Sequence, residues 1–247
     1  MGEPVEVHLG IDDSKIYYAY PTKLKDYQDF YSGLGIMSLE KFEFHEMLEK
    51  SIKENVFPKE INDFHQEMIN NDIGVFESLR FLQIYKISTP IVNSVLVGMY
   101  DFFKLVFKDE TALDSVVTPE QFEKCKEIIR DLNGVKYKKP SPNPEIRYYD
   151  ELKAKSEELK YGKITFEAIY TSIIVEVGYT PEQVNELTIK QFMSIFDRIK
   201  SFKAYDATTM YAIMGDVEIH QWYAESDKEK KRKTLSNNDL KHGSKNL

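Results

Sequence analysis

Two histidines lie in segments with helical patterning, where neighbouring side chains could complete a metal site. His45 and Glu49 are four residues apart, the spacing that places two ligands on one face of a helix. A zinc site needs at least three protein ligands, and neither this segment nor the one around His65 supplies a second histidine one turn away. His220 and His242 have no such companions. The sequence therefore predicts no metal site.

The single cysteine and one glycine-containing stretch are the next candidates for chemistry. Cys125 lies inside the helical pattern FEKCKEII, away from a helix N-terminus, so we expect a buried structural thiol and not a nucleophile. The stretch SGLGIMS, residues 32–38, lacks the lysine and the further glycines of a phosphate-binding loop. We interpret Gly33 and Gly35 as a helix end followed by a turn.

Acidic residues are plentiful, but their spacing selects no catalytic pair. The loops GIDDS (residues 10–14) and NNDIG (residues 70–74) lack the alternating ligands and the terminal glutamate of a calcium-binding EF-hand. Most of the 41 Asp and Glu residues fall at solvent-facing positions of helical patterns. The sequence therefore assigns no catalytic, cofactor-binding or metal-binding residue, and no cofactor is expected.

The charge distribution argues against a protein that coats nucleic acid. The net charge is −8, and seven Lys/Arg against four Asp/Glu give residues 225–247 a charge of +3, which leaves −11 for the rest. The run KEKKRK, residues 228–233, has no interleaved aromatic residues. We interpret it as part of a solvated tail, with contact to phosphate as the alternative.

The most apolar segment, Thr89–Phe107, is interpreted as a buried helix. It contains Asn93, Asp101 and Lys104 and falls short of an uninterrupted membrane span. The N-terminal MGEPVEVHLG carries acids where a signal peptide needs basic and apolar residues. A single cysteine excludes an internal disulfide and is typical of a reducing cytoplasm. We expect a soluble cytoplasmic protein with no membrane contact.

The chain begins with the pattern of a β-hairpin and continues as helices. Residues 5–9 (VEVHL) and 15–21 (KIYYAYP) are β-rich runs joined by a turn-forming GIDDS. Thr-Pro-Glu-Gln occurs at residues 118–121 and 180–183, and Thr-Ile-Lys-Gln at 188–191, each the opening of a helix with a capping Thr and a reciprocating Gln. Ser38 is expected to cap a further helix.

The expected fold is mainly α, with an N-terminal β-hairpin, a multi-helix bundle, a small all-α C-terminal domain and a disordered basic tail. Three prolines between residues 140 and 144 mark a linker, since no helix interior accepts them. The predicted organisation is a hairpin and helical domain at 1–139, a linker at 140–147, a helical domain at 148–224 and a disordered tail at 225–247. In the helix that opens at Thr188, one face is expected to be core; its members are Ile189, Phe192, Phe196, Ile199 and Phe202.

Three stretches, taken in order, resemble a known family. LTIKQFMSIFDRIKSFKAYDATTMYAIMGDVEIHQWY (residues 187–223) is similar to the C-terminal part of tail-assembly proteins of long-tailed phages that infect Gram-positive bacteria. KIYYAYPTKLKDYQDFY (residues 15–31) resembles the opening of that family, and LNGVKYKKPSPNPEI (residues 132–146) resembles its linker. The sequence departs from the pattern at Asn133-Gly134, where the family has Asn-Cys.

The resemblance implies a non-enzymatic protein of a phage or prophage. It implies a chaperone that keeps the tape-measure protein soluble during tail formation, in the cytoplasm of the infected bacterial host. A baseplate or hub assembly protein, or a structural tail protein that stays in the virion, is the alternative within the same resemblance. The resemblance carries over no catalytic residue.

A helical cytoplasmic enzyme or regulator, with a site scattered through the sequence, is the rival from a different class. A pocket that gathers several carboxylates with His45 would favour the enzyme. An exposed apolar groove would favour the chaperone, because a protein that shields apolar helices needs apolar contact surface.

Overall fold

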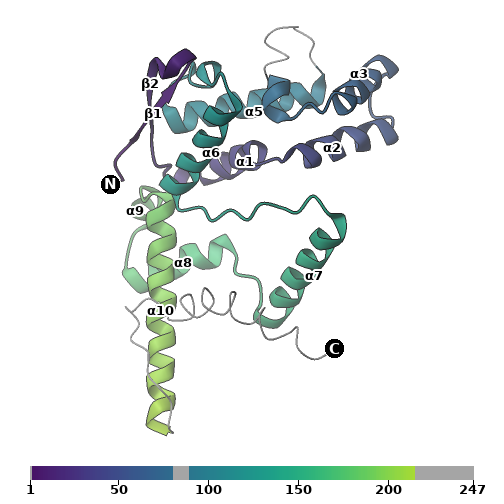
Figure 1. The fold of residues 1–247 in the computed structure, drawn as a ribbon. Coiled ribbons are helices and arrows are strands. Elements are labelled where there is room, and N and C mark those ends of the chain that lie inside the picture. The colour runs from purple at the N-terminus through teal and green to yellow at the C-terminus, as the bar shows by residue number, and fades with distance from the viewer. Residues whose placement is uncertain (1, 80–88, 215–247) are drawn as a thin grey trace, which may run out of the picture. The chain divides into compact units, whose positions relative to one another are not determined.

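The computed structural model describes residues 2–79 and 89–214 (Figure 1). It divides into two compact units, Met1–Ser194 and Ile195–Leu247, which are described separately. The domain bounds predicted from the sequence stay a prediction. The disordered tail expected at residues 225–247, and Trp222, lie outside the described residues.

The fold is mainly α with an N-terminal hairpin, as the sequence predicts. Residues 75–79 are also helical, and three short 3-10 turns among the described residues occupy Ile11–Asp13, Leu24–Asp26 and Leu113–Ser115. The α-helices are α1 (Tyr27–Met37), α2 (Lys41–Lys53), α3 (Lys59–Asn70), α5 (Pro90–Phe107), α6 (Pro119–Asn133), α7 (Pro144–Tyr161), α8 (Phe166–Val177), α9 (Pro181–Asn185) and α10 (Ile189–Met214).

The predicted hairpin is confirmed. Strand β1 (Val5–Leu9) pairs antiparallel with β2 (Lys15–Ala19), in a register from Val5 opposite Ala19 to Leu9 opposite Lys15. Alternate side chains point to opposite faces of a strand, and those of one face, namely Val7, Leu9, Tyr17 and Ala19, are buried. The hairpin lies beside α5 and α6 (Figure 1), and the backbone N–H of Tyr20 donates to the carbonyl of Val106 on α5.

The interpretation of Gly33 and Gly35 as a helix end is wrong, because α1 continues through both residues to Met37. A β-carbon at Gly33 would lie 2.3 Å from the ring of Phe102 on α5. One at Gly98 of α5 would lie 2.4 Å from the side chain of Ile36. Gly33 and Gly98 therefore allow α1 and α5 to approach closely. The close packing offsets the low helix propensity of glycine in the two helices.

The prediction that Ser38 caps a helix is also wrong. Ser38 is the C-cap of α1. Helix α2 begins at Lys41, and its N-cap is Glu40. The Glu40 side chain accepts from the backbone of Glu43, whose own side chain accepts from the backbone N–H of Glu40 at 2.9 Å. A carboxylate at the N-cap satisfies the free amides of the first turn as a hydroxyl would.

Helix α5 supplies much of the core of the first unit. By length and composition it is the one helix among the described residues that could cross a membrane, with a mean hydropathy of 1.3 over 18 residues. Its buried side chains are Val92, Val95, Met99, Phe102, Phe103, Val106 and Phe107. A core helix of this kind passes the same test, so the composition is weak evidence for a membrane span.

The corner between α9 and α10 is built as its two capping boxes predict. Thr180 and Gln183 exchange hydrogen bonds at the start of α9, and Thr188 and Gln191 do so at the start of α10. The corner also docks on the segment after β2, where Lys23 forms a β-bridge with Thr188. This bridge joins two segments of the first unit that are more than 160 residues apart in sequence.

His65 is buried in a chain of hydrogen bonds between α2, α3 and the start of α5. Its Nδ1 lies 3.1 Å from the hydroxyl of Ser51, which donates to the carbonyl of Leu48. Its Nε2 lies 3.0 Å from the hydroxyl of Thr89, whose oxygen accepts from the backbone N–H of Val92. Every group is satisfied when the ring is neutral and carries its proton on Nδ1.

Burial lowers the pKa of His65 below its ordinary value of 6.5, since the charged form loses solvation. The unfolded chain therefore binds more protons between the two pKa values. Stability from this residue is complete above about pH 6.5 and is lost as the pH falls towards the folded pKa. We expect urea unfolding between about pH 7.5 and 5 to show a smaller pH-dependent loss of stability in His65→Gln than in the unaltered protein. An unchanged pH profile in His65→Gln would contradict the assignment.

Candidate partner-binding surface

The residues that the sequence offers for chemistry lie apart in the structure. Cys125 is fully buried, and burial raises the pKa of its thiol to about 12, which confirms the expected structural thiol. The Nε2 of His45 lies 2.8 Å from the carbonyl of Ile73. Within residues 2–79 and 89–214, no three His, Cys, Asp or Glu side chains are grouped as metal ligands.

The segment between α6 and α7, residues 134–143 and called the linker from here on, borders an open hollow of about 520 Å³ together with α7 and Glu43 of α2. Lys138 pairs with Asp150 on α7 at 2.7 Å, and Arg147 on α7 pairs with Glu46 on α2 at 2.5 Å. The lining also holds Glu43, Lys139, Glu151, Lys153 and Glu157. Opposite charges alternate in the hollow, so it presents neither the acidic pair of an acid–base site nor the basic cradle of an anion site.

The linker itself is anchored by Tyr137. The guanidinium of Arg130 lies 3.8 Å from the centre of its ring, and its hydroxyl donates to the carbonyl of Ser38 at 3.2 Å. Burial and the neighbouring Glu40 carboxylate raise the pKa of Tyr137 to about 12. These contacts hold the linker next to Lys138, the residue that pairs with Asp150 of α7.

Helix α7 turns its charged side towards this hollow and leaves apolar side chains in solvent. The side chains that line the hollow from α7 are those of Arg147, Asp150, Glu151, Lys153, Ala154 and Glu157. The apolar residues on the other side are exposed by 59% (Tyr148), 69% (Tyr149), 42% (Leu152) and 88% (Leu159). This is the reverse of the usual arrangement, in which an amphipathic helix covers its apolar stripe with the protein core.

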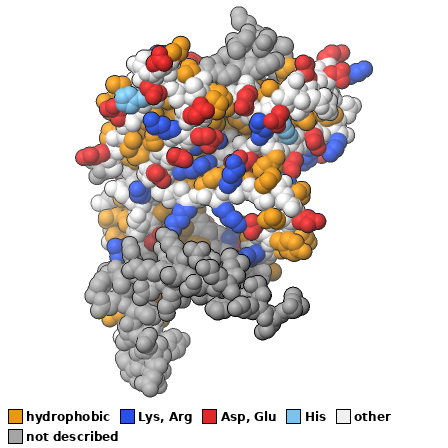
Figure 2. All heavy atoms as spheres, viewed as in Figure 1, with side chains coloured by type: hydrophobic (Ala, Val, Ile, Leu, Met, Phe, Trp, Pro, Cys, Tyr) orange, Lys and Arg blue, Asp and Glu red, His pale blue; other side chains and the backbone are white. Residues whose placement is uncertain are grey.

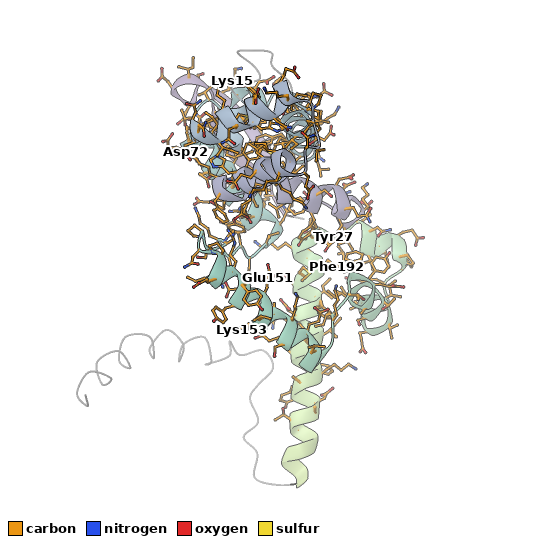
Figure 3. The ribbon with its side chains drawn as sticks, turned by 90° about the vertical axis from the view of Figure 1, so that its right-hand side faces the viewer. Lys15, Tyr27, Asp72, Glu151, Lys153 and Phe192 are labelled. Carbon is orange, nitrogen blue, oxygen red and sulfur yellow. The ribbon has the colours of Figure 1, made fainter. Side chains whose placement is uncertain are left out.

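An aromatic cluster packs one side of α8 against α1 and the start of α10. The ring of Phe166 lies 4.4 Å from that of Tyr27 on α1 and 5.5 Å from that of Phe192 at the start of α10, between centroids. Figure 3 labels Tyr27 and Phe192, which approach α8 from their two helices. The Tyr170 hydroxyl donates to the carbonyl of Pro181 at 3.1 Å. Burial raises the pKa of Tyr27.

The opposite side of α8 is uncharged and largely exposed, and it carries Ala168, Thr171, Ser172 and Val175. Val175 is 77% exposed. The charged residues of α8 are two glutamates, and the helix contains no lysine or arginine. Thr171 and Ser172 lie on that side and donate their hydroxyl protons to backbone carbonyls of α8, at 2.8 and 2.7 Å. Their donors are therefore satisfied within the helix, so covering them with another apolar surface leaves no unpaired proton. The exposed side of α8, from Ala168 to Val175, is called the α8 face below.

The surface over the N-terminal helices has a different character. Figure 2 shows acidic and basic side chains interspersed there, among smaller apolar areas. Mixed charge of this kind keeps a surface solvated and offers no single-sign field to a ligand. The α8 face and the exposed side of α7 are therefore the stronger candidates for contact with a partner.

Comparison with known proteins places this region in a phage context. Residues 153–227 match the family model described as the YomV second domain. Over 226 residues the chain is 24% identical to the SPbeta prophage-derived uncharacterized protein YomV of Bacillus subtilis (strain 168), covering 90% of this chain and 84% of that protein. The matches indicate a phage-derived protein. No solved structure matches.

The matched segment includes α8, α9 and the described part of α10, and it begins within α7. It therefore contains the α8 face and the end of the exposed apolar side of α7. The sequence by itself does not single out Val175, Tyr149 or Leu159 as exposed apolar residues. The available signal was the three- and seven-residue spacing of Tyr149, Leu152 and Leu159, which marks an apolar side without showing whether that side is covered.

Proposed function

We propose that this protein is a non-enzymatic tail-assembly protein of a phage or prophage, acting as a chaperone that keeps the tape-measure protein soluble while the tail forms. It works in the cytoplasm of the infected bacterial host. The observation that carries the proposal is the α8 face, an uncharged helix surface centred on the exposed Val175, within a segment that matches a domain of a prophage protein.

A chaperone of this kind shields the apolar surface of its client from water. An apolar helix of a client protein aggregates because its surface is in contact with water, and covering each Å² of apolar surface contributes about 25 cal/mol. The α8 face supplies such cover and carries no basic residue of its own. The enzyme alternative calls for His45 in a pocket with carboxylates, whereas His45 bonds to the carbonyl of Ile73 and the carboxylates of the linker hollow alternate with lysine and arginine.

The test is co-expression with the tape-measure protein of the same phage. We expect the client to be soluble in the presence of this protein and insoluble without it. The pair should co-purify at about 1 M NaCl, since salt screens exposed ion pairs and leaves apolar burial intact. Val175→Glu should weaken the complex about tenfold or more, because it places a charge in the covered surface.

Val97→Glu is the matched control. Val97 is 55% exposed on α5, so this variant introduces the same charge on an exposed helical valine outside the α8 face. A client whose solubility does not depend on this protein would refute the chaperone proposal. Co-purification with a baseplate or hub protein, or retention of the chain in the virion, would point to the alternative assembly role.

A further inference from the structure

Helix α7 carries a second apolar surface that the α8 face does not explain. Tyr149, Leu152, Ser156 and Leu159 follow one another at intervals of three, four and three residues. This is the spacing with which one helix packs against another in a coiled coil, over two heptads. These four residues are called the α7 seam.

The orientation of the α7 seam is imposed by the charged side of the helix. Asp150 bonds to Lys138 in the linker, and Arg147 bonds to Glu46 on α2 while its guanidinium lies 4.7 Å from the ring of Phe42. These contacts hold the polar side of α7 against the body of the first unit. The seam is left pointing to solvent, and none of the described side chains of α7 is buried.

Two tyrosine rings lie together at one end of the seam. The rings of Tyr148 and Tyr149 lie 6.1 Å apart at 60°, an edge-to-face arrangement that aromatic side chains favour. Aromatic residues lose little rotamer freedom when covered, which makes them common anchors of interfaces. The seam therefore combines two features of a binding site, apolar anchors and a backbone held in place.

The charges beside the seam select its partner. In the heptad that places Tyr149 and Leu152 at the apolar positions, Lys153 and Lys155 occupy the two flanking positions, and both are exposed. Lys153 lies at the border between the two sides of the helix, since it also lines the hollow. Flanking positions of facing helices meet in a coiled coil and determine which helices pair. A second copy in antiparallel register would bring lysine against lysine, which disfavours self-association.

We propose that the α7 seam docks an amphipathic helix of another protein, with an apolar heptad stripe bordered by glutamate or aspartate. The site is separate from the α8 face and does not depend on the proposed chaperone function. Two heptads bury few side chains, so binding through this site is weak when it acts by itself. Its role is to add charge selectivity to association.

The test uses two synthetic peptides with the same leucine stripe over three heptads. One has glutamate and the other lysine at all flanking positions, so that neither peptide pairs with itself. Fluorescence anisotropy with the full chain, at about 0.1 M salt, measures the affinity of each. We expect the glutamate peptide to bind at least about tenfold more tightly than the lysine peptide, and raising the salt to narrow the difference.

Two variants locate the site. Tyr149→Gln with Leu159→Gln should abolish binding, and because these positions are 69% and 88% exposed the fold should be unchanged. Lys153→Glu with Lys155→Glu should reverse the preference in favour of the lysine peptide. Val97→Gln, an exposed apolar residue on α5, should leave binding unaltered.

Three outcomes would overturn the proposal. Equal binding of both peptides, or no binding of either, would remove the charge-selected helix as the occupant. Sedimentation that shows a dimer lost in the glutamine double variant would assign the seam to a second copy of the chain. Binding to phosphatidylglycerol vesicles that the same variant abolishes would assign it to a lipid surface. If the peptides fail while the tape-measure protein still co-purifies, the proposed function stands without this site.

Discussion

Replacing Phe192 with alanine is expected to lower the free energy of unfolding by about 3–5 kcal/mol, the cost of removing a fully buried aromatic side chain. Phe192 is 0% exposed, and its ring lies 5.5 Å from that of Phe166 and 6.5 Å from that of Tyr170, between centroids. Its loss leaves a cavity exactly where α8 attaches to the start of α10. Urea unfolding followed by circular dichroism measures the change.

Phe202→Ala is the control on the same helix. Phe202 is 46% exposed, so its replacement should change stability by no more than about 0.5–1 kcal/mol. The sequence predicts a single core face from Ile189 to Phe202. Ile189 and Phe192 are buried as predicted, Phe196 and Ile199 are only partly buried, and the prediction is wrong at Phe202. Equal effects of the two variants would show that the burial of Phe192 does not hold α8 in place.

Gly33→Ala is expected to destabilise the first unit by about 1–3 kcal/mol or more, the cost of forcing atoms into a packed contact. The added β-carbon would lie 2.3–2.6 Å from Cδ2, Cγ and Cβ of Phe102. Because the Phe102 Cβ is fixed to the backbone of α5, a change of rotamer cannot relieve the clash, and the two helices must move apart. This cost exceeds the roughly 0.5–1 kcal/mol that alanine gains over glycine in a helix.

Gly35→Ala should stabilise the protein, the opposite of the effect expected for Gly33→Ala. A β-carbon at Gly35 meets nothing within 4 Å, so only the gain in helix propensity remains, about 0.5–1 kcal/mol of added stability. Thermal unfolding of both variants gives the comparison. Stabilisation by both substitutions would contradict the close approach of α1 and α5.

The exposed apolar sides of α7 and α8 explain why the candidate site was the least predictable part of the protein. An apolar stripe in a sequence normally marks a side that the core covers, and the stripe from Tyr149 to Leu159 has the same spacing as a covered one. Whether it is covered depends on the ion pairs of Asp150 and Arg147 with residues of the linker and α2. Those partners are far away in sequence or unrelated in pattern, so spacing could not reveal them.

The sequence by itself determined the features that depend on residues within one or two turns of each other. The hairpin turn and the capping boxes at Thr180 and Thr188 are of this kind, because a turn or a cap is completed by atoms a few residues away. The tertiary structure decided the role of Gly33, the exposure of Phe202 and the outward side of α7. Each depends on which element packs against the residue, and that choice is made by contacts between segments as distant as α1 and α5, which no local pattern encodes.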